Sequence, residues 1–198
     1  KKFREFMISL VPSWAVYNEE FWETIKHRNL WFIKLRYGAV LMLFAFIVSS
    51  EFLLGIGFTQ TQLVALTLIN CSILVYNGIL QWLRVYLKCE PFKFNPLHFS
   101  LVQMVLDLSA LMLLVYFTGG IETPLFMLFV FHMIIGSLIL PGTVIYTIAI
   151  SVVFIFFGMV LGEYHNLISH HAVAGLLQTP LYNNFKFIVT YSIVFGFV

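Results

Sequence analysis

Six apolar stretches follow one another along the chain, each bounded by glycine, proline or charged residues. A helix needs about 20 apolar residues to cross the hydrocarbon core of a bilayer. None of the stretches alternates apolar and polar residues, as the strand of a membrane barrel would. The predicted spans are Tyr37–Leu54, Gln62–Leu83, Leu97–Phe117, a shorter Pro124–Leu140, Thr143–Leu161 and an unfinished Phe185–Val198. The pattern therefore predicts an all-α membrane protein built as a six-transmembrane-helix bundle.

The segment 1–36 contains no such stretch, but it carries two short apolar stripes at helical spacing. One stripe consists of Phe3, Phe6, Met7 and Leu10, and the other of Phe21, Trp22 and Ile25. Stripes of this kind, with charges opposite, are typical of helices that lie in the membrane interface. We therefore expect one or two N-terminal interfacial helices in residues 1–36, ahead of a transmembrane domain in residues 37–198. A helix that binds a partner is the alternative interpretation.

Lysine and arginine are distributed very unevenly among the predicted loops. Of the 11 such residues, only Lys186 lies outside the segments 1–36 and 84–96. Positive charge accumulates on the cytoplasmic side of membrane proteins. We therefore expect both ends of the chain in the cytoplasm, and the loops 119–123 and 162–184 outside.

The composition restricts the class of protein further. Hydrophobic residues make up 61% of the 198 residues and charged residues 10%, and the mean hydropathy is +0.94. A soluble domain has about 25% charged residues, and a net charge of +2 without a basic face excludes a nucleic-acid-binding role. No hydrolase motif, P-loop or metal-ligand cluster is present, so we expect neither catalytic residues nor a metal site. Because the chain starts without Met and stops within an apolar run, we expect a longer protein.

Three polar residues share one depth in three successive spans. From the predicted span ends and a rise of about 1.5 Å per residue, Asn70, Asp107 and His132 lie roughly 12–15 Å from the outer surface. Gln103 and Asn77 form a second layer nearer the cytoplasm. Polar residues at such depth are costly and often functional. The layer is either a buried Asp107–His132 pair with Asn70 as third partner, or a set of hydrogen bonds that only hold the helices together.

The outer loop between the third and fourth spans has a defined local chemistry. Gly119 and Gly120 permit positive φ and a tight reversal. Thr123 is a natural N-cap and Pro124 a natural first helical residue. With Glu122 they form a candidate sensing site, because free N–H groups at the helix start can donate hydrogen bonds to a carbonyl or an anion. A compact hairpin without a ligand is the alternative.

This region also resembles a known family. The stretch that begins at Asp107, continues with Tyr116–Pro124 (YFTGGIETP) and ends at Leu140-Pro141 resembles the six-span sensor region of bacterial membrane histidine kinases. The nearest patterns are those of RegB-type redox sensors and of kinases that control pilus genes. The basic aromatic run Asn29–Tyr37 is also similar to these kinases.

The resemblance implies the input domain of a two-component sensor histidine kinase in the bacterial inner membrane. It implies a homodimer whose last span continues into an ATP-dependent kinase that serves a cytoplasmic response regulator. In RegB-type sensors the loop reads Gly-Gly-x-x-Asn-Pro-Phe and is implicated in sensing quinone, so quinone is the ligand implied. Gly119, Gly120 and Pro124 match, whereas Thr123 replaces Asn and Leu125 replaces Phe.

Two other functions stay open on the sequence. A small transporter or channel subunit could use the Asn70, Asp107 and His132 layer as a path for protons or ions. An intramembrane enzyme or haem protein is the third possibility.

Overall fold

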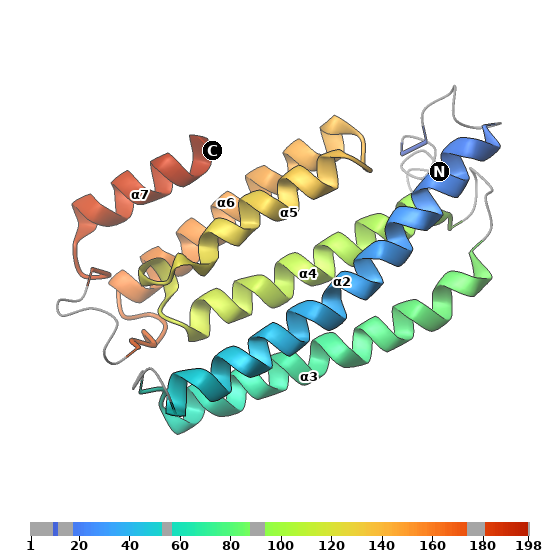
Figure 1. The fold of residues 1–198 in the computed structure, drawn as a ribbon. Helices are drawn as coiled ribbons and strands as arrows, with labels where there is room; N and C mark the ends of the chain where they lie inside the picture. The colour runs from blue at the N-terminus through green and yellow to red at the C-terminus, as the bar shows by residue number, and fades with distance from the viewer. Residues whose placement is uncertain (1–9, 12–17, 53–56, 88–93, 174–180, 198) are drawn as a thin grey trace.

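The computed structural model describes residues 10–11, 18–52, 57–87, 94–173 and 181–197, and within these ranges the chain is helical without strands (Figure 1). The α-helices are α2 (Glu19–Phe52), α3 (Gln60–Leu83), α4 (Pro96–Phe117), α5 (Leu128–Ser137), α6 (Gly142–Tyr164) and α7 (Phe185–Phe197). Three 3₁₀ turns connect them: η2 (Arg84–Tyr86), η3 (Gly120–Glu122) and η4 (Pro124–Met127). The predicted all-α fold is confirmed.

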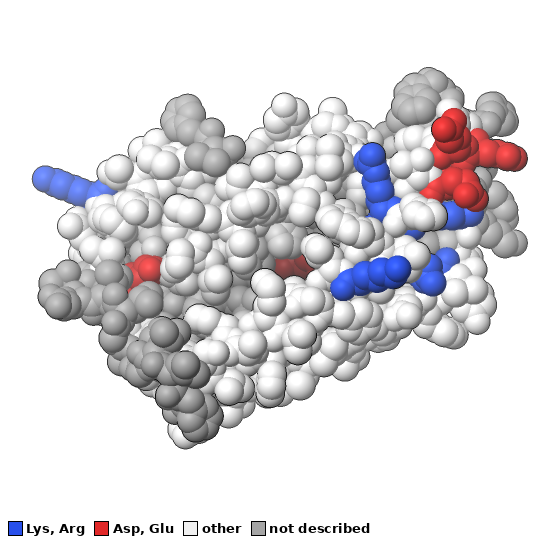
Figure 2. Space-filling view, in the orientation of Figure 1, with Lys and Arg blue, Asp and Glu red and all other residues white. Residues whose placement is uncertain are grey.

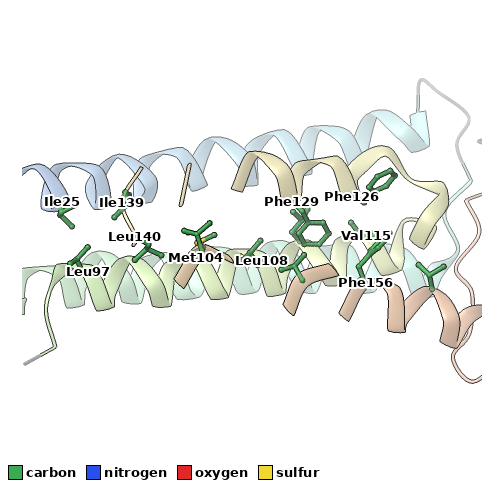
Figure 3. Packing of buried hydrophobic residues seen from close by; sticks show 14 of the residues in the cluster. Ile25, Leu97, Met104, Leu108, Val115, Phe126, Phe129, Ile139, Leu140 and Phe156 are labelled. Atoms are coloured by element: carbon green, nitrogen blue, oxygen red, sulfur yellow. The ribbon is translucent and has the colours of Figure 1, made fainter. Parts of the chain in front are cut away.

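Helix α4 lies at the centre of the bundle. It contacts α2 and α3 on one side and α5 and α6 on the other, while α7 packs against α6 (Figure 1). Buried apolar side chains fill the space between α4, α5 and α6, and Figure 3 shows Phe129 and Phe156 projecting toward Val115 of α4. The ring centroids of Phe129 and Phe156 are 6.5 Å apart. This packing fixes the position of α5, which carries His132.

Four of the described helices are long and apolar enough to cross a membrane: Glu19–Ser50, Gln60–Tyr86, Pro96–Phe117 and Gly142–Tyr164. The helical stretches Pro124–Ser137 and Phe185–Gly196 are apolar but shorter. Figure 2 shows charged side chains toward the two ends of a largely uncharged face, with acidic atoms also visible in a hollow midway along it. These features describe a multi-pass membrane protein.

Helix α2 begins much earlier than the predicted first span. Its 34 residues extend about 51 Å at 1.5 Å per residue, and the helix continues without a break across Arg36 and Tyr37. Trp22 and Ile25, expected in a separate surface helix, lie in its first turns and are buried in the core. Of the first predicted stripe, Phe3, Phe6 and Met7 lie outside the described residues, and Leu10 is buried.

Two helix starts follow from local sequence. Thr59 and Gln62 form a reciprocal capping box at the start of α3. At the start of α4, the Asn95 side chain accepts hydrogen bonds from the backbone N–H groups of Leu97 and His98, and Pro96 occupies the first turn. These caps fix where α3 and α4 begin. They therefore also fix the positions of the polar side chains along the two helix axes.

Candidate functional site

A buried ion pair joins α2 to α4 in the middle of the bundle. Arg36 donates through Nε to Oδ1 of Asp107 and through Nη2 to Oδ2, both at 2.7 Å. The two side chains are 7% and 18% exposed. Tyr76 of α3 also donates to Asp107 Oδ1 at 2.8 Å. A bidentate, hydrogen-bonded pair of this kind is the arrangement in which a carboxylate can stay charged away from water.

The ion pair belongs to a network that connects three helices. Arg36 Nη1 donates to Gln103 Oε1 at 2.7 Å and to Asn77 Oδ1 at 3.3 Å. Gln103 and Ser100 both donate to Oδ1 of Asn29, at 3.1 and 2.7 Å. Asn77 in turn donates to the carbonyl of Ile33. The network thereby fixes the register of α2, α3 and α4 relative to one another.

The predicted layer of Asn70, Asp107 and His132 has separate partners in the structure. Asp107 pairs with Arg36, Asn70 Nδ2 donates to the carbonyl of Val40 at 3.4 Å, and His132 Nδ1 donates to the carbonyl of Leu128 at 3.0 Å. The partner missed by the sequence analysis is Arg36, which was expected in the cytoplasmic segment. Asp107 and His132 do not pair with each other in the part of the chain that the structure describes, but both line the same cavity.

The cavity has a volume of about 290 Å³ and lies between α2, α4 and α5, with α3 at its side. Its walls are mainly apolar, and its polar lining includes Arg36, Tyr76, Gln103, Asp107 and His132. The rim is formed by residues exposed on the surface of the bundle, among them Leu35 at 48% and Phe131 at 61%. Figure 2 shows a hollow with acidic atoms at its bottom midway along this face. The cavity therefore opens toward lipid and ends at the ion pair.

The outer loop has the local geometry that its sequence predicts. Gly119 and Gly120 have φ angles of 112° and 57°, which side chains with a Cβ rarely adopt. Thr123 Oγ1 accepts a hydrogen bond from the backbone N–H of Leu125, with Pro124 in the first position of η4. The expected helix therefore begins at the expected residue, but as a 3₁₀ turn.

Glu122 connects this loop to the segment that leads into α7. Its Oε1 accepts hydrogen bonds from the backbone N–H groups of Leu181 at 2.6 Å and Tyr182 at 3.3 Å. Its Oε2 lies 3.3 Å from Nε2 of His170, whose Nδ1 lies 3.4 Å from the buried Glu163 of α6. Glu163 and His170 were not among the predicted site residues. Within the described ranges no group of three or more ligating side chains could hold a metal ion.

The surroundings of His170 favour its protonated form. Burial alone would lower the pKa of His170, but the carboxylates of Glu163 and Glu122 outweigh burial and raise the pKa. The imidazole ring stacks on Tyr182 with a centroid distance of 3.9 Å. For the neighbouring His171, burial lowers the pKa. A protonated His170 thus bridges the carboxylates of η3 and α6.

We expect this bridge to make stability depend on pH. Because the pKa of His170 is raised in the folded state, its contribution is complete below the unfolded value of about 6.5 and is lost as pH rises through the higher folded value. The thermal midpoint in detergent should therefore fall as pH rises above about 6.5, and this fall should be smaller in His170→Phe. The exposed His165 provides the matched variant, His165→Phe, in which the wild-type fall should persist. An equal fall in wild type and His170→Phe would contradict the assignment.

A comparison with known protein families matches most of the chain. The family model for the PilS-like transmembrane domain matches residues 19–192. No curated protein and no solved structure matches the chain. The matched range includes α2 from its first residue, the ion pair, the cavity and the outer loop. The chain therefore belongs to the family of PilS-like transmembrane domains, and is a membrane domain of the sensor type.

Proposed function

We propose that the chain is the transmembrane input domain of a two-component sensor histidine kinase. The family is named after PilS, which is a sensor histidine kinase. On this proposal the domain lies in a bacterial inner membrane with both ends in the cytoplasm and forms a homodimer. The kinase that it controls phosphorylates a cytoplasmic response regulator.

The observation that carries the proposal is the contact of Glu122 with the segment that leads into α7. Glu122 lies in η3, directly after the loop glycines, and binds the backbone of Leu181 and Tyr182 a few residues before α7 begins at Phe185. On this proposal, a displacement of the loop moves the first turn of α7 through these two hydrogen bonds. A signal acts by binding one arrangement of the loop and α7 more tightly than the other.

The side chains of the outer loop offer an oxidised quinone few hydrogen-bond donors. Quinone carbonyls accept hydrogen bonds, so a quinone site needs donors beside an apolar slot. In the loop, the Glu122 carboxylate is an acceptor that is already bound, and Thr123 Oγ1 accepts a hydrogen bond from Leu125, which leaves its own O–H as a donor. No step of the proposal therefore depends on a quinone.

The transporter alternative requires a polar path through the layer of Asn70, Asp107 and His132. Asp107 is neutralised by Arg36, and the three side chains have separate partners. The contacts in the described ranges thus favour a static ion pair over a path. Proton flux in liposomes that is abolished by Asp107→Asn would reverse this conclusion.

The test of the proposed function uses the full-length gene product in liposomes with labelled ATP. We expect phosphorylation of a histidine, and we expect Glu122→Ala to change its steady-state level about fivefold or more, since allosteric coupling is typically 1–3 kcal/mol. Glu23 of α2 is exposed, so Glu23→Ala should retain the wild-type level. Absence of ATP-dependent phosphorylation in the wild type would refute the kinase assignment, and an unchanged level in Glu122→Ala would refute the role of the loop.

A further inference from the structure

The cavity that ends at the ion pair has the size of a site for a small ligand. Its volume of about 290 Å³ lies near the lower limit of typical ligand pockets, about 300 Å³. Its apolar walls and lipid-facing rim would be covered in the membrane by an apolar group. A compact, lipid-soluble molecule fits this space.

The charge balance of the cavity favours an uncharged ligand. Arg36 and Asp107 neutralise each other through two hydrogen bonds. An anion would be repelled by the carboxylate and a cation by the guanidinium, and either would have to leave water to enter.

The hydrogen-bonding capacity left at the end of the cavity is mainly that of acceptors. Four of the five N–H groups of Arg36 are engaged, by Asp107 twice, Gln103 and Asn77. The Asp107 carboxylate accepts three hydrogen bonds and has room for a fourth. It is also more exposed than Arg36, at 18% against 7%.

His132 on the opposite wall presents the same polarity. Its Nδ1 lies 3.0 Å from the carbonyl of Leu128, which can only accept, so Nδ1 carries the hydrogen. In the neutral ring Nε2 is then an acceptor. Both Asp107 of α4 and His132 of α5 therefore present hydrogen-bond acceptors to the cavity, and they suit a ligand that carries a donor.

We propose that this cavity binds an uncharged, membrane-dissolved molecule whose hydroxyl group donates a hydrogen bond to Asp107 or His132, as an alkylphenol would. The apolar part of the molecule lies between α2 and α5. A molecule that enters the cavity from the lipid contacts the ion pair that holds α2 against α4. The position of these helices then depends on whether the cavity is occupied. The inference concerns binding alone and does not require that a kinase follows the domain.

The test uses a 4-alkylphenol with a diazirine in its chain, applied to the protein in phosphatidylcholine liposomes, with the labelled peptides identified by mass spectrometry. We expect labelling of α2 and α5 residues that line the cavity, and protection by unlabelled 4-hexylphenol. The methyl ether of 4-hexylphenol lacks the donor. Its half-protecting concentration should be about tenfold higher, which corresponds to about 1.4 kcal/mol and lies within the cost of leaving a buried acceptor unpaired.

Two substitutions on the same helix separate the cavity from the general lipid surface. Ala39 lines the cavity and Ala45 is exposed to lipid elsewhere on α2. Ala39→Phe should abolish the competable labelling, and Ala45→Phe should preserve it. Equal protection by the phenol and its ether would refute the donor requirement. Competable labelling that survives Ala39→Phe, or labelling that no competitor reduces, would refute the site itself.

Discussion

Replacement of Arg36 by methionine should strongly destabilise the bundle. The change leaves the Asp107 carboxylate buried without its bidentate partner, and it removes the donors for Gln103 and Asn77. Breaking a buried ion pair at one end costs about 3–5 kcal/mol. The thermal midpoint in detergent micelles should fall by about 10 °C, given about 2–4 °C per kcal/mol for a protein of this size.

Two further variants identify the cause of that loss. The double variant Arg36→Met with Asp107→Leu removes both charges, so it should be more stable than Arg36→Met alone. Lys34 lies two residues away on the exposed face of α2, and Lys34→Met should leave the midpoint close to that of the wild type. If the double variant is as unstable as the sum of the single variants, the ion pair does not couple the two helices.

The helices of this protein can be predicted from its sequence because a bilayer imposes their length and polarity. The start of α2 could not be placed in this way. From the sequence alone, Arg36 is interpreted as a positive charge that flanks a span, because lysines and arginines accumulate beside membrane spans. Its burial depends on Asp107, which is 71 residues away, and no local pattern contains that contact.

A weaker signal for Arg36 is nevertheless present in the spacing of polar residues. Asn29 and Arg36 are seven residues apart on α2, and Ser100 and Asp107 are seven residues apart on α4. Residues at this spacing lie on one face of a helix, two turns apart. The two faces do meet, through Ser100 with Asn29 and Asp107 with Arg36.

The outer loop was predictable where its geometry is local. Two glycines, a capping threonine and a proline specify the turn, and each takes the expected position. The ties of Glu122 to His170 and to the backbone of Leu181 span 48 and 59 residues. Such contacts depend on how α6 and its following loop return to α4, which periodicity does not determine.

Substitution of Gly120 is the second change for which we expect a large effect. A Cβ at this position would lie 2.5 Å from Glu163 Oε2, and the residue has a φ of 57°. Left-handed backbone costs a residue with a Cβ about 1–2 kcal/mol, and a β-branched residue more. Because Glu163 is 1% exposed, its carboxylate has little space into which it can move.

We therefore expect Gly120→Ala to cost about 2 kcal/mol and Gly120→Val about 3 kcal/mol or more of unfolding free energy. Gly119 also has a positive φ, but a Cβ there would have no neighbour closer than 3.7 Å. Its φ of 112° lies further from the left-handed region than the 57° of Gly120, so Gly119→Ala gives an upper limit for the backbone contribution. Gly158 of α6 has no neighbour within 4 Å, and Gly158→Ala should leave stability unchanged or raise it.

Thermal midpoints of these variants in detergent, measured at one pH, decide the matter. If Gly120→Ala costs no more than about 1 kcal/mol, the lower end of the cost of left-handed backbone alone, then contact with Glu163 adds nothing and the cluster with His170 is not tightly packed. If it costs clearly more, the displaced carboxylate also loses its approach to His170. The fall in stability as pH rises above about 6.5 should then become smaller in Gly120→Ala, because less of the His170 contribution remains to be lost.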